Sequence, residues 1–321
     1  MKKIVHIIVA TVMALCATVA HAAYPERAAR IIVPFPPGGP TDVQARLIAQ
    51  RLSDRLGETF IVENRPGAGG NIGTRAAAQS PGDGYTLLFM TPAQVINMKF
   101  YSTPGYDLKT DFAPIGLVST APALLLAHPS LGATSLADVI RLAKEKPGEI
   151  AFASSGAGLS THLMMESFMK HTDIQMIHVP YRGSAPALSG LIAGDTSLLM
   201  DSVVSGLPHV QSGALRAIAV SSAERSPVAP DIPTMRESGL TDFAAITWYG
   251  IMAPIKTPND IVLQLAAEID KILQEPDIRK RFLEMGTEPA KVDPDAFAKF
   301  LDAEAERWLE VVQSSGARME E

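Results

Sequence analysis

Glycine-containing turns stand between an apolar run and a helical pattern at three places in this sequence, residues 35–42, 154–162 and 181–184. Such a turn leaves the first N–H groups of a helix free and puts the positive end of the helix dipole at the edge of a sheet. These groups bind an anion without a charged side chain. One such turn is weak evidence, but three that face one crevice would form an anion site.

The first turn follows the apolar residues 31–33 and contains FPPGGPTD. Its prolines and glycines exclude both helix and strand. We expect Thr41 to be the N-cap of a helix over residues 43–56, because Gln44 completes the spacing of a capping box.

Polar side chains near the other two turns permit several interpretations. Ser160 (or Ser155) and His162 could form a catalytic triad with Asp201, although the sequence has no G-x-S-x-G elbow and Ser160 also suits a helix cap. Asp201 could bind an N–H or O–H group of a ligand or cap the helix after it. Arg182 could pair with a carboxylate or lie in solvent.

The aromatic residues near these turns are equally open to two interpretations. Phe35, Tyr181 and Trp248 could form apolar walls of a crevice or belong to the core. His162 is expected near a helix N-terminus, where the dipole favours a neutral ring that donates a hydrogen bond to a ligand or to the backbone; a ring that only packs is the alternative.

No pattern in the sequence predicts a cofactor or a metal ion. Residues 67–73 read GAGGNIG, but three residues intervene after the preceding strand and the acidic residue of a dinucleotide site is missing, so we expect a structural turn. The other histidines of the chain lack the spacing of metal ligands. Cys16 is the single cysteine of the sequence, so the segment that follows it can form neither a disulfide nor a reactive thiolate.

The order of elements predicts an α/β fold with two lobes. Apolar runs alternate with helical patterns, which is typical of parallel α/β units. Extended segments near residues 121 and 247 indicate that the chain crosses from one lobe to the other and back. We expect residues 24–121 and 248–321 to form one lobe and residues 122–247 the other, each a mainly parallel sheet flanked by helices and joined by two crossover strands. Such lobes hinge about a cleft.

Residues 1–23 have the pattern of a secretory signal peptide: Lys2 and Lys3, an apolar stretch, and an A-x-A site at residues 20–22. Cleavage would change the formal net charge from −6 to −8. This charge opposes binding to nucleic acid or to an anionic membrane surface. We expect a soluble, exported, monomeric protein in the periplasm.

Eight segments together resemble the extracytoplasmic solute receptors of tripartite tricarboxylate transporters, the Bug family. They are VPFPPGGPTDVQAR, VENRPGAGGNIG, DGYTLL, PSLGATSLADVI, SSGAGLSTHLMME, HVPYRGSAPAL, APDIPTMRESG and WYGIMAP. The resemblance implies a two-lobed periplasmic binding protein fold, type II-like, that closes on a small carboxylate and delivers it to membrane transporter subunits. It implies no enzyme activity and no cofactor.

The resemblance also implies which residues contact the ligand. The first turn would hold a carboxylate largely through backbone N–H groups and waters, and the other two turns would contribute from the second lobe. The residues expected at the site are Phe35, Pro37, Gly38, Gly39, Thr41, Asp42, Thr91, Ser154, Ser155, Gly158, Ser160, His162, Tyr181, Arg182, Gly183, Ser184, Asp201 and Trp248. A periplasmic sensor that presents the bound acid to a signalling partner, and a serine hydrolase using Ser160 and His162, are the alternatives.

Overall fold

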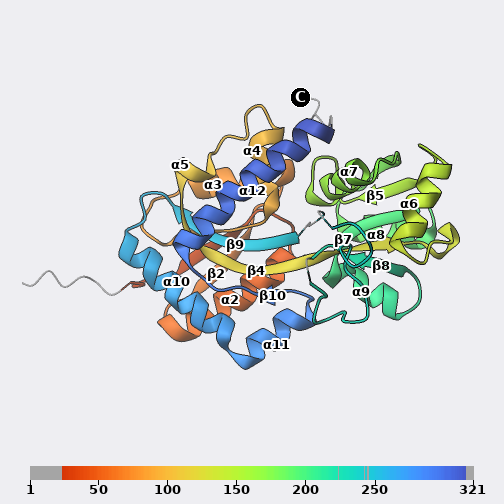
Figure 1. Ribbon diagram of the computed structural model, residues 1–321. Helices are drawn as coiled ribbons and strands as arrows, with labels where there is room; N and C mark the ends of the chain where they lie inside the picture. The colour runs from red at the N-terminus through yellow and green to blue at the C-terminus, as the bar shows by residue number, and fades with distance from the viewer. Residues whose placement is uncertain (1–23, 223, 242, 244–245, 316–321) are drawn as a thin grey trace, which may run out of the picture.

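The chain folds into two α/β halves joined by a long strand (Figure 1). A computed structural model describes residues 24–222, 224–241, 243 and 246–315. The first half contains β1 (Ala29–Val33), β2 (Phe60–Asn64), β3 (Thr86–Met90), β9 (Ile246–Pro254), β10 (Glu288–Pro289), α2 (Pro40–Leu56), η1 (Ala68–Gly70), α3 (Asn71–Ala78), α4 (Pro92–Phe100), α5 (Leu108–Asp111), α10 (Asn259–Gln274), α11 (Pro276–Glu284) and α12 (Pro294–Ser315). The second half contains β5 (Ala151–Ser154), β6 (Ile177–Pro180), β7 (Leu198–Ser202), β8 (Arg216–Val220), η2 (Pro129–Leu131), α6 (Leu136–Glu145), α7 (Ser160–Thr172), α8 (Ser184–Ala193) and α9 (Val203–Gln211). The long strand is β4 (Phe112–Ala127).

Within each half the strands run mainly parallel, as predicted, and the two crossover strands, β4 and β9, make the sheets mixed. β1 is parallel to β2 and β3, and β5 is parallel to β6 and β7. The pairings of β9 with β3, and of β4 with β7, β8, β9 and β10, are antiparallel. The chain passes between the halves once in each direction, so the two strands that carry it, β4 and β9, run opposite ways. The α/β class itself is confirmed.

β4 belongs to both halves. It pairs with β9 from Phe112 to Pro122, and from Ala123 onward it lies between β7 and β8. This change of partner lies next to the crossing predicted near residue 121, and β9 begins next to the one predicted near 247. The exact lobe boundaries stay a prediction.

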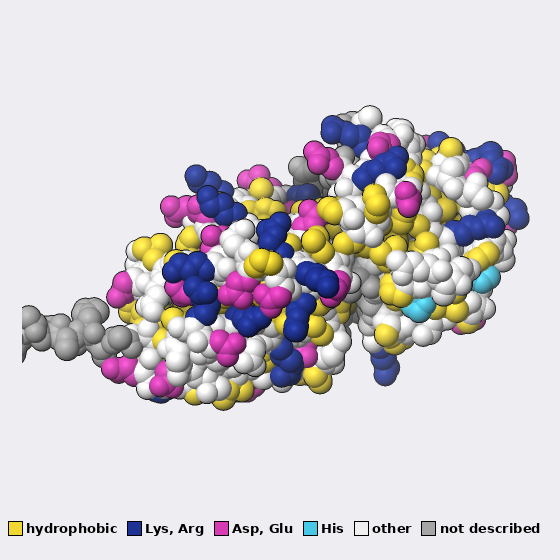
Figure 2. Space-filling view, turned by 90° about the horizontal axis from the view of Figure 1, so that it is seen from below, with side chains coloured by type: hydrophobic (Ala, Val, Ile, Leu, Met, Phe, Trp, Pro, Cys, Tyr) yellow, Lys and Arg dark blue, Asp and Glu magenta, His cyan; other side chains and the backbone are white. Residues whose placement is uncertain are grey.

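The first half has a core on each face of its sheet. Ile31, Ile32 and Val33 of β1 are fully buried, which accounts for the apolar run in the sequence. α2 and α10 pack on one face, and α4 and α12 pack on the other. On the outer side of α2, α10 and α11, cationic and acidic side chains intersperse, as Figure 2 shows, with Arg55 Nε 2.7 Å from Glu268 Oε2.

The helix after the first turn begins earlier than predicted. α2 starts at Pro40, with Gly39 as its N-cap and no side-chain capping bond, so the prediction of Thr41 as N-cap is wrong. Proline is favoured in the first helical turn because its missing N–H needs no partner there. The consequence is an uncapped N-terminus. No helix in the described part of the chain is long and apolar enough to cross a membrane.

Candidate functional site

A cavity of about 580 Å³ lies where the two halves meet, and we call it the central cavity. Its wall is formed by the turns before α2, α7 and α8, the start of α4, the end of β7 and part of β9. The expected site residues that line it are Phe35, Pro37, Gly38, Gly39, Thr41, Thr91, Ser155, Ser160, Arg182, Gly183, Ser184 and Asp201. All three glycine turns predicted from the sequence therefore meet at one hollow.

Three helices start at this cavity without a side-chain cap. Their N-caps are Gly39 for α2, Leu159 for α7 and Gly183 for α8. The first-turn amides that donate to no other described group are those of Thr41, Asp42, Ser160, Thr161, Ser184 and Ala185. The partial positive charge of three helix ends is therefore directed at one place. By contrast, the Thr91 side chain caps α4 by accepting from the Ala93 N–H.

The side chain of Asp42 fixes the first turn from behind and does not line the cavity, so the group that this residue offers to a ligand is its backbone N–H. Its Oδ2 accepts from the Gly38 N–H at 2.9 Å and from Arg46 Nε at 2.9 Å, and its Oδ1 accepts from Asn64 Nδ2 at 2.9 Å. Burial alone would raise the pKa of Asp42, but these hydrogen bonds outweigh it and hold the pKa below its usual value. The carboxylate thus locks Gly38, whose φ of +84° suits glycine.

Behind the second turn, two stacked histidines hold the loop. The rings of His162 and His178 stack with their centroids 3.8 Å apart. His162 Nδ1 accepts from the Gly158 N–H at 3.0 Å, and His178 Nε2 lies 2.6 Å from Ser154 Oγ. Ser154, Gly158 and His162 are therefore absent from the described lining, because their side chains or amides are used within the loop and not for a ligand.

The groups around His162 are not arranged as in a serine hydrolase. Ser160 lines the cavity, but the described contacts use both nitrogens of His162, since Nδ1 accepts from the backbone and Nε2 lies 3.3 Å from Glu166 Oε1. The expectation that this ring donates to a ligand or to the backbone is wrong: it accepts from the backbone. No group of three or more His, Cys, Asp or Glu residues that could hold a metal ion occurs among the described residues.

The third turn joins the second through main-chain bonds. The Tyr181 N–H donates to the Ser154 carbonyl at 3.0 Å and the Gly183 N–H to that of Ser155 at 2.9 Å. The ring of Tyr181 lies against Gly190 and outside the lining, so its predicted place in the cavity is corrected. Arg182 is exposed and lines the cavity, and it makes no hydrogen bond or ion pair with another described residue.

Trp248 is also not part of the wall. It is fully buried, and its Nε1 donates to Glu304 Oε2 at 2.6 Å. Its neighbours Thr247 and Tyr249 line the cavity instead. Side chains alternate along a strand, so one residue on the far face of β9 puts the residues on either side of it on the near face. The aromatic type of Trp248 suggested a wall residue, but the parity of β9 places it on the far face.

Asp201 contributes the single carboxyl group of the described lining. Its Oδ1 accepts from the Ser202 N–H at 2.7 Å and from Ser184 Oγ at 3.3 Å, whereas its buried Oδ2 has no partner among the described groups. Burial raises the pKa of Asp201 to about 6 against the opposing effect of these hydrogen bonds.

The remaining lining residues were not predicted. They are Pro36, Pro40, Pro92, Ala93, Leu159, Thr161, Ala185, Pro186, Leu188, Ser202, Ser205, Thr247 and Tyr249. Pro36, Pro40, Leu159 and Thr161 lie inside the predicted turns, and most of the others lie within two positions of a predicted residue.

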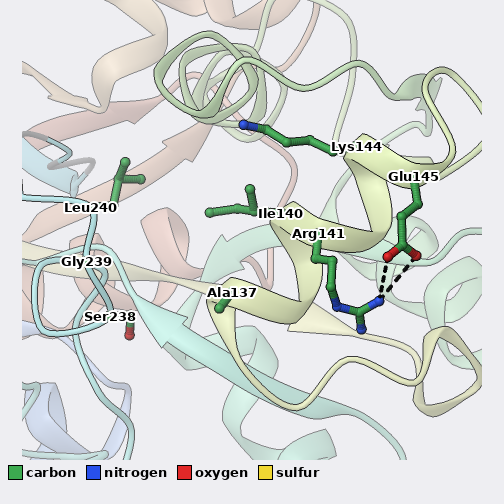
Figure 3. A pocket seen from close by; sticks show the side chains of 8 residues that line it. All are labelled: Ala137, Ile140, Arg141, Lys144, Glu145, Ser238, Gly239 and Leu240. Carbon is green, nitrogen blue, oxygen red and sulfur yellow. Dashed lines mark hydrogen bonds and ion pairs between the residues drawn. The ribbon is translucent and has the colours of Figure 1, made fainter.

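A second hollow of about 550 Å³ lies between α6 and residues 238–240 (Figure 3). Arg141 and Glu145 at its rim pair with each other at 3.0 Å. Its described lining consists of residues of α6 and of the segment 238–240, and none of the expected site residues is among them. The central cavity is therefore the candidate site.

Comparisons with known proteins agree on one family. The model of the family described as "Tripartite tricarboxylate transporter family receptor" matches residues 44–317. Protein BugT of Bordetella pertussis is 38% identical over 307 residues, which are 95% of this chain and 94% of that protein. The structure of R. palustris Rpa4515 with adipate is 36% identical and has a TM-score of 0.85, covering 92% of this chain and 100% of that chain. The structure of MatC from Rhodopseudomonas palustris with bound malate is 31% identical and has a TM-score of 0.80, covering 90% and 100%.

Proposed function

Because this chain belongs to the tripartite tricarboxylate transporter receptor family, a family of solute receptors and not of enzymes, we propose that it captures a small carboxylate in the central cavity. The observation that carries the proposal is the meeting of three uncapped helix N-termini, those of α2, α7 and α8. An oxygen anion placed there receives hydrogen bonds from main-chain groups that the fold has already oriented.

Main-chain capture suits a protein of this charge. The chain carries a formal net charge of −6, so an acid approaches it against the overall field. Helix ends provide local partial positive charge without needing a buried lysine or arginine. Exclusion of water from the site would strengthen each of these bonds, because electrostatic interactions grow as the local dielectric falls.

Size and charge favour a dicarboxylate. A cavity of about 580 Å³ is in the range of small-molecule sites. The exposed guanidinium of Arg182 stands at the wall and offers a second anion contact apart from the helix ends. Adipate and malate, the acids in two structures of relatives, each have two carboxylates.

The same proposal includes the place and partners of the receptor. The pattern of residues 1–23, which lie outside the described residues, supports export to the periplasm. The halves would close about β4 and β9, and membrane transporter subunits would recognise the closed, ligand-bound monomer.

A thermal-shift screen tests the proposal directly. The protein without residues 1–23 is mixed with succinate, malate, adipate and citrate, and with succinamide as a neutral control of matched shape. A ligand at 100 times its Kd adds about 2.7 kcal/mol to the free energy of unfolding, so at least one acid raises Tm by several degrees and the amide does not. Equal shifts with acid and amide, or no shift with any acid, would refute carboxylate capture. Uptake of the same acid in a strain lacking the gene then tests the transport role.

A further inference from the structure

Asp201 is an unusual group to find in the wall of an anion site. Only 4% of its surface is exposed, and it is the one acidic side chain among the described residues that line the central cavity. A negatively charged ligand would be repelled by this carboxylate unless something lies between them. A residue of this kind therefore needs an explanation.

The hydrogen bonds around Asp201 leave one position open. Oδ1 is satisfied by the Ser202 N–H at 2.7 Å and by Ser184 Oγ at 3.3 Å, but Oδ2 is buried and has no partner among the described residues. Buried polar atoms of proteins nearly always have a partner, and the exceptions are often functional.

The surrounding hydroxyl groups do not fill this position. The hydroxyl of Ser184 already donates to Oδ1. That of Ser205 donates to the Ser202 carbonyl at 3.0 Å and lies near enough to Asp201 to lower its pKa, but it forms no hydrogen bond to Oδ2. Tyr249 is close enough that the charge of Asp201, after burial, contributes to raising its pKa, yet it makes no hydrogen bond to Oδ2. All four of these residues line the same cavity as Asp201. Because Asp201 lines the cavity, a group in the cavity can supply the donor that Oδ2 lacks.

We propose that Oδ2 of Asp201 accepts a hydrogen bond from a hydroxyl or ammonium group of the bound acid, so that the receptor selects carboxylic acids that carry such a donor. The proposal rests on the proposed function, because it concerns the same cavity. Helix N-termini bind the carboxylate, and the orphan acceptor recognises the substituent. A site built to bind an OH or NH group rejects the analogue without it, because the acceptor of the protein then stays unpaired.

The experiment compares acids that share a carbon skeleton and differ in their substituent, in two series. Calorimetry at pH 8 measures Kd for succinate, L-malate and L-aspartate, and for adipate and L-2-aminoadipate. Within the series that binds, we expect the tightest acid that carries a hydroxyl or ammonium group to have a Kd at least tenfold lower than that of the unsubstituted acid. In Asp201→Asn the loss of the negative charge should reduce the advantage of the ammonium-bearing acid at least fivefold. Asp173→Asn, an exposed position at the other end of α7, removes one charge elsewhere and should leave the ratio unchanged.

A pH titration of the unmodified protein gives a second test that does not depend on the folding of a variant. Burial raises the pKa of Asp201 to about 6, so at pH 5 the carboxyl is mostly protonated and can itself donate to an unsubstituted acid. The other ionisable side chains of the described lining are Arg182 and Tyr249, and burial raises the pKa of Tyr249 further above the range from pH 5 to pH 8. When each Kd is corrected for the fraction of the acid that is fully ionised at that pH, the preference for the donor-bearing acid should therefore shrink between pH 8 and pH 5.

The outcomes separate this inference from the proposed function. If succinate or adipate binds as tightly as its substituted partner, or if Asp201→Asn leaves the ratios unchanged, the role of Asp201 is refuted while carboxylate capture stands. If none of the five acids binds, the capture of small dicarboxylates itself is refuted.

Discussion

The substitution Gly39→Val tests the helix-end mechanism with little disturbance of the fold. Gly39 has φ −79° and ψ 168°, which is extended backbone open to any residue, and it precedes Pro40, which favours this conformation. A Cβ at Gly39 meets no atom nearer than the Pro36 carbonyl oxygen at 4.0 Å. The valine would therefore fit the backbone, and its two methyl groups would lie at the wall of the central cavity.

The expected loss of affinity follows from the amides that valine shields. The free N–H groups of Thr41 and Asp42 lie two and three residues after Gly39, and a hydrogen bond to a charged oxygen contributes about 1.5–3 kcal/mol. Losing both costs about 3–6 kcal/mol, which corresponds to a 10²- to 10⁴-fold higher Kd. Valine is a poorer N-cap than glycine, so we expect a loss of about 1 kcal/mol or less in the free energy of unfolding.

Gly57→Val is the matched control, because Gly57 is at the C-terminal end of the same helix. It has φ +80° and open space around its Cβ, so the substitution strains the backbone by about 1–2 kcal/mol without reaching the cavity. Calorimetry with the acid that gives the largest thermal shift, together with urea unfolding, should show opposite behaviour: Gly39→Val loses binding and Gly57→Val loses stability. A Kd within threefold of the unmodified protein for Gly39→Val would refute the mechanism.

Three further predictions concern groups around the site. Glu304 Oε2 accepts hydrogen bonds from Trp248 Nε1 at 2.6 Å and from Trp308 Nε1 at 3.0 Å, and Glu304→Ala leaves both N–H groups without this acceptor. The substitution should lower the free energy of unfolding by about 3–5 kcal/mol in urea, and a loss below 1 kcal/mol would contradict a structural role. Burial, and then the stacked ring of His162, lower the pKa of His178 to about 4, so the unfolded chain binds the proton first and the free energy of unfolding should fall as pH decreases from about 6.5 towards 4. His178→Phe should flatten this pH dependence in urea unfolding, and an unchanged pH dependence would show that another group causes it. Burial raises the pKa of Asp201 from 3.8 to about 6, so the ionised form costs roughly 3 kcal/mol, and Asp201→Asn should stabilise the protein by up to that amount at pH 8 but not at pH 4 in thermal unfolding; equal effects at both values would contradict the reasoning.

The sequence predicted the turns of the site because their signals are local. An apolar run, glycine and proline, and a helical pattern follow one another within a few residues, and each signal has a steric cause. α4, Pro92–Phe100, was missed because nearly all of its first two turns is buried, and a helix buried all round shows no amphipathic period.

Which side of a turn faces the ligand could not be predicted from local signals. Ser154 and His162 face away because His178 and the Gly158 amide hold them, and one of these partners lies on another strand. Trp248 faces away because the parity of β9 is set by its pairing with β3 and β4. Such choices depend on contacts between segments far apart in the sequence.

The continuity of β4 restricts how this molecule can move. One strand lies in both sheets, and its partners change between Pro122 and Ala123, where proline supplies no N–H to the ladder. A swing of one half against the other would concentrate its bending at this pair of residues and leave each sheet rigid. Few residues would then become more ordered when the ligand binds, so little conformational entropy would be lost on binding.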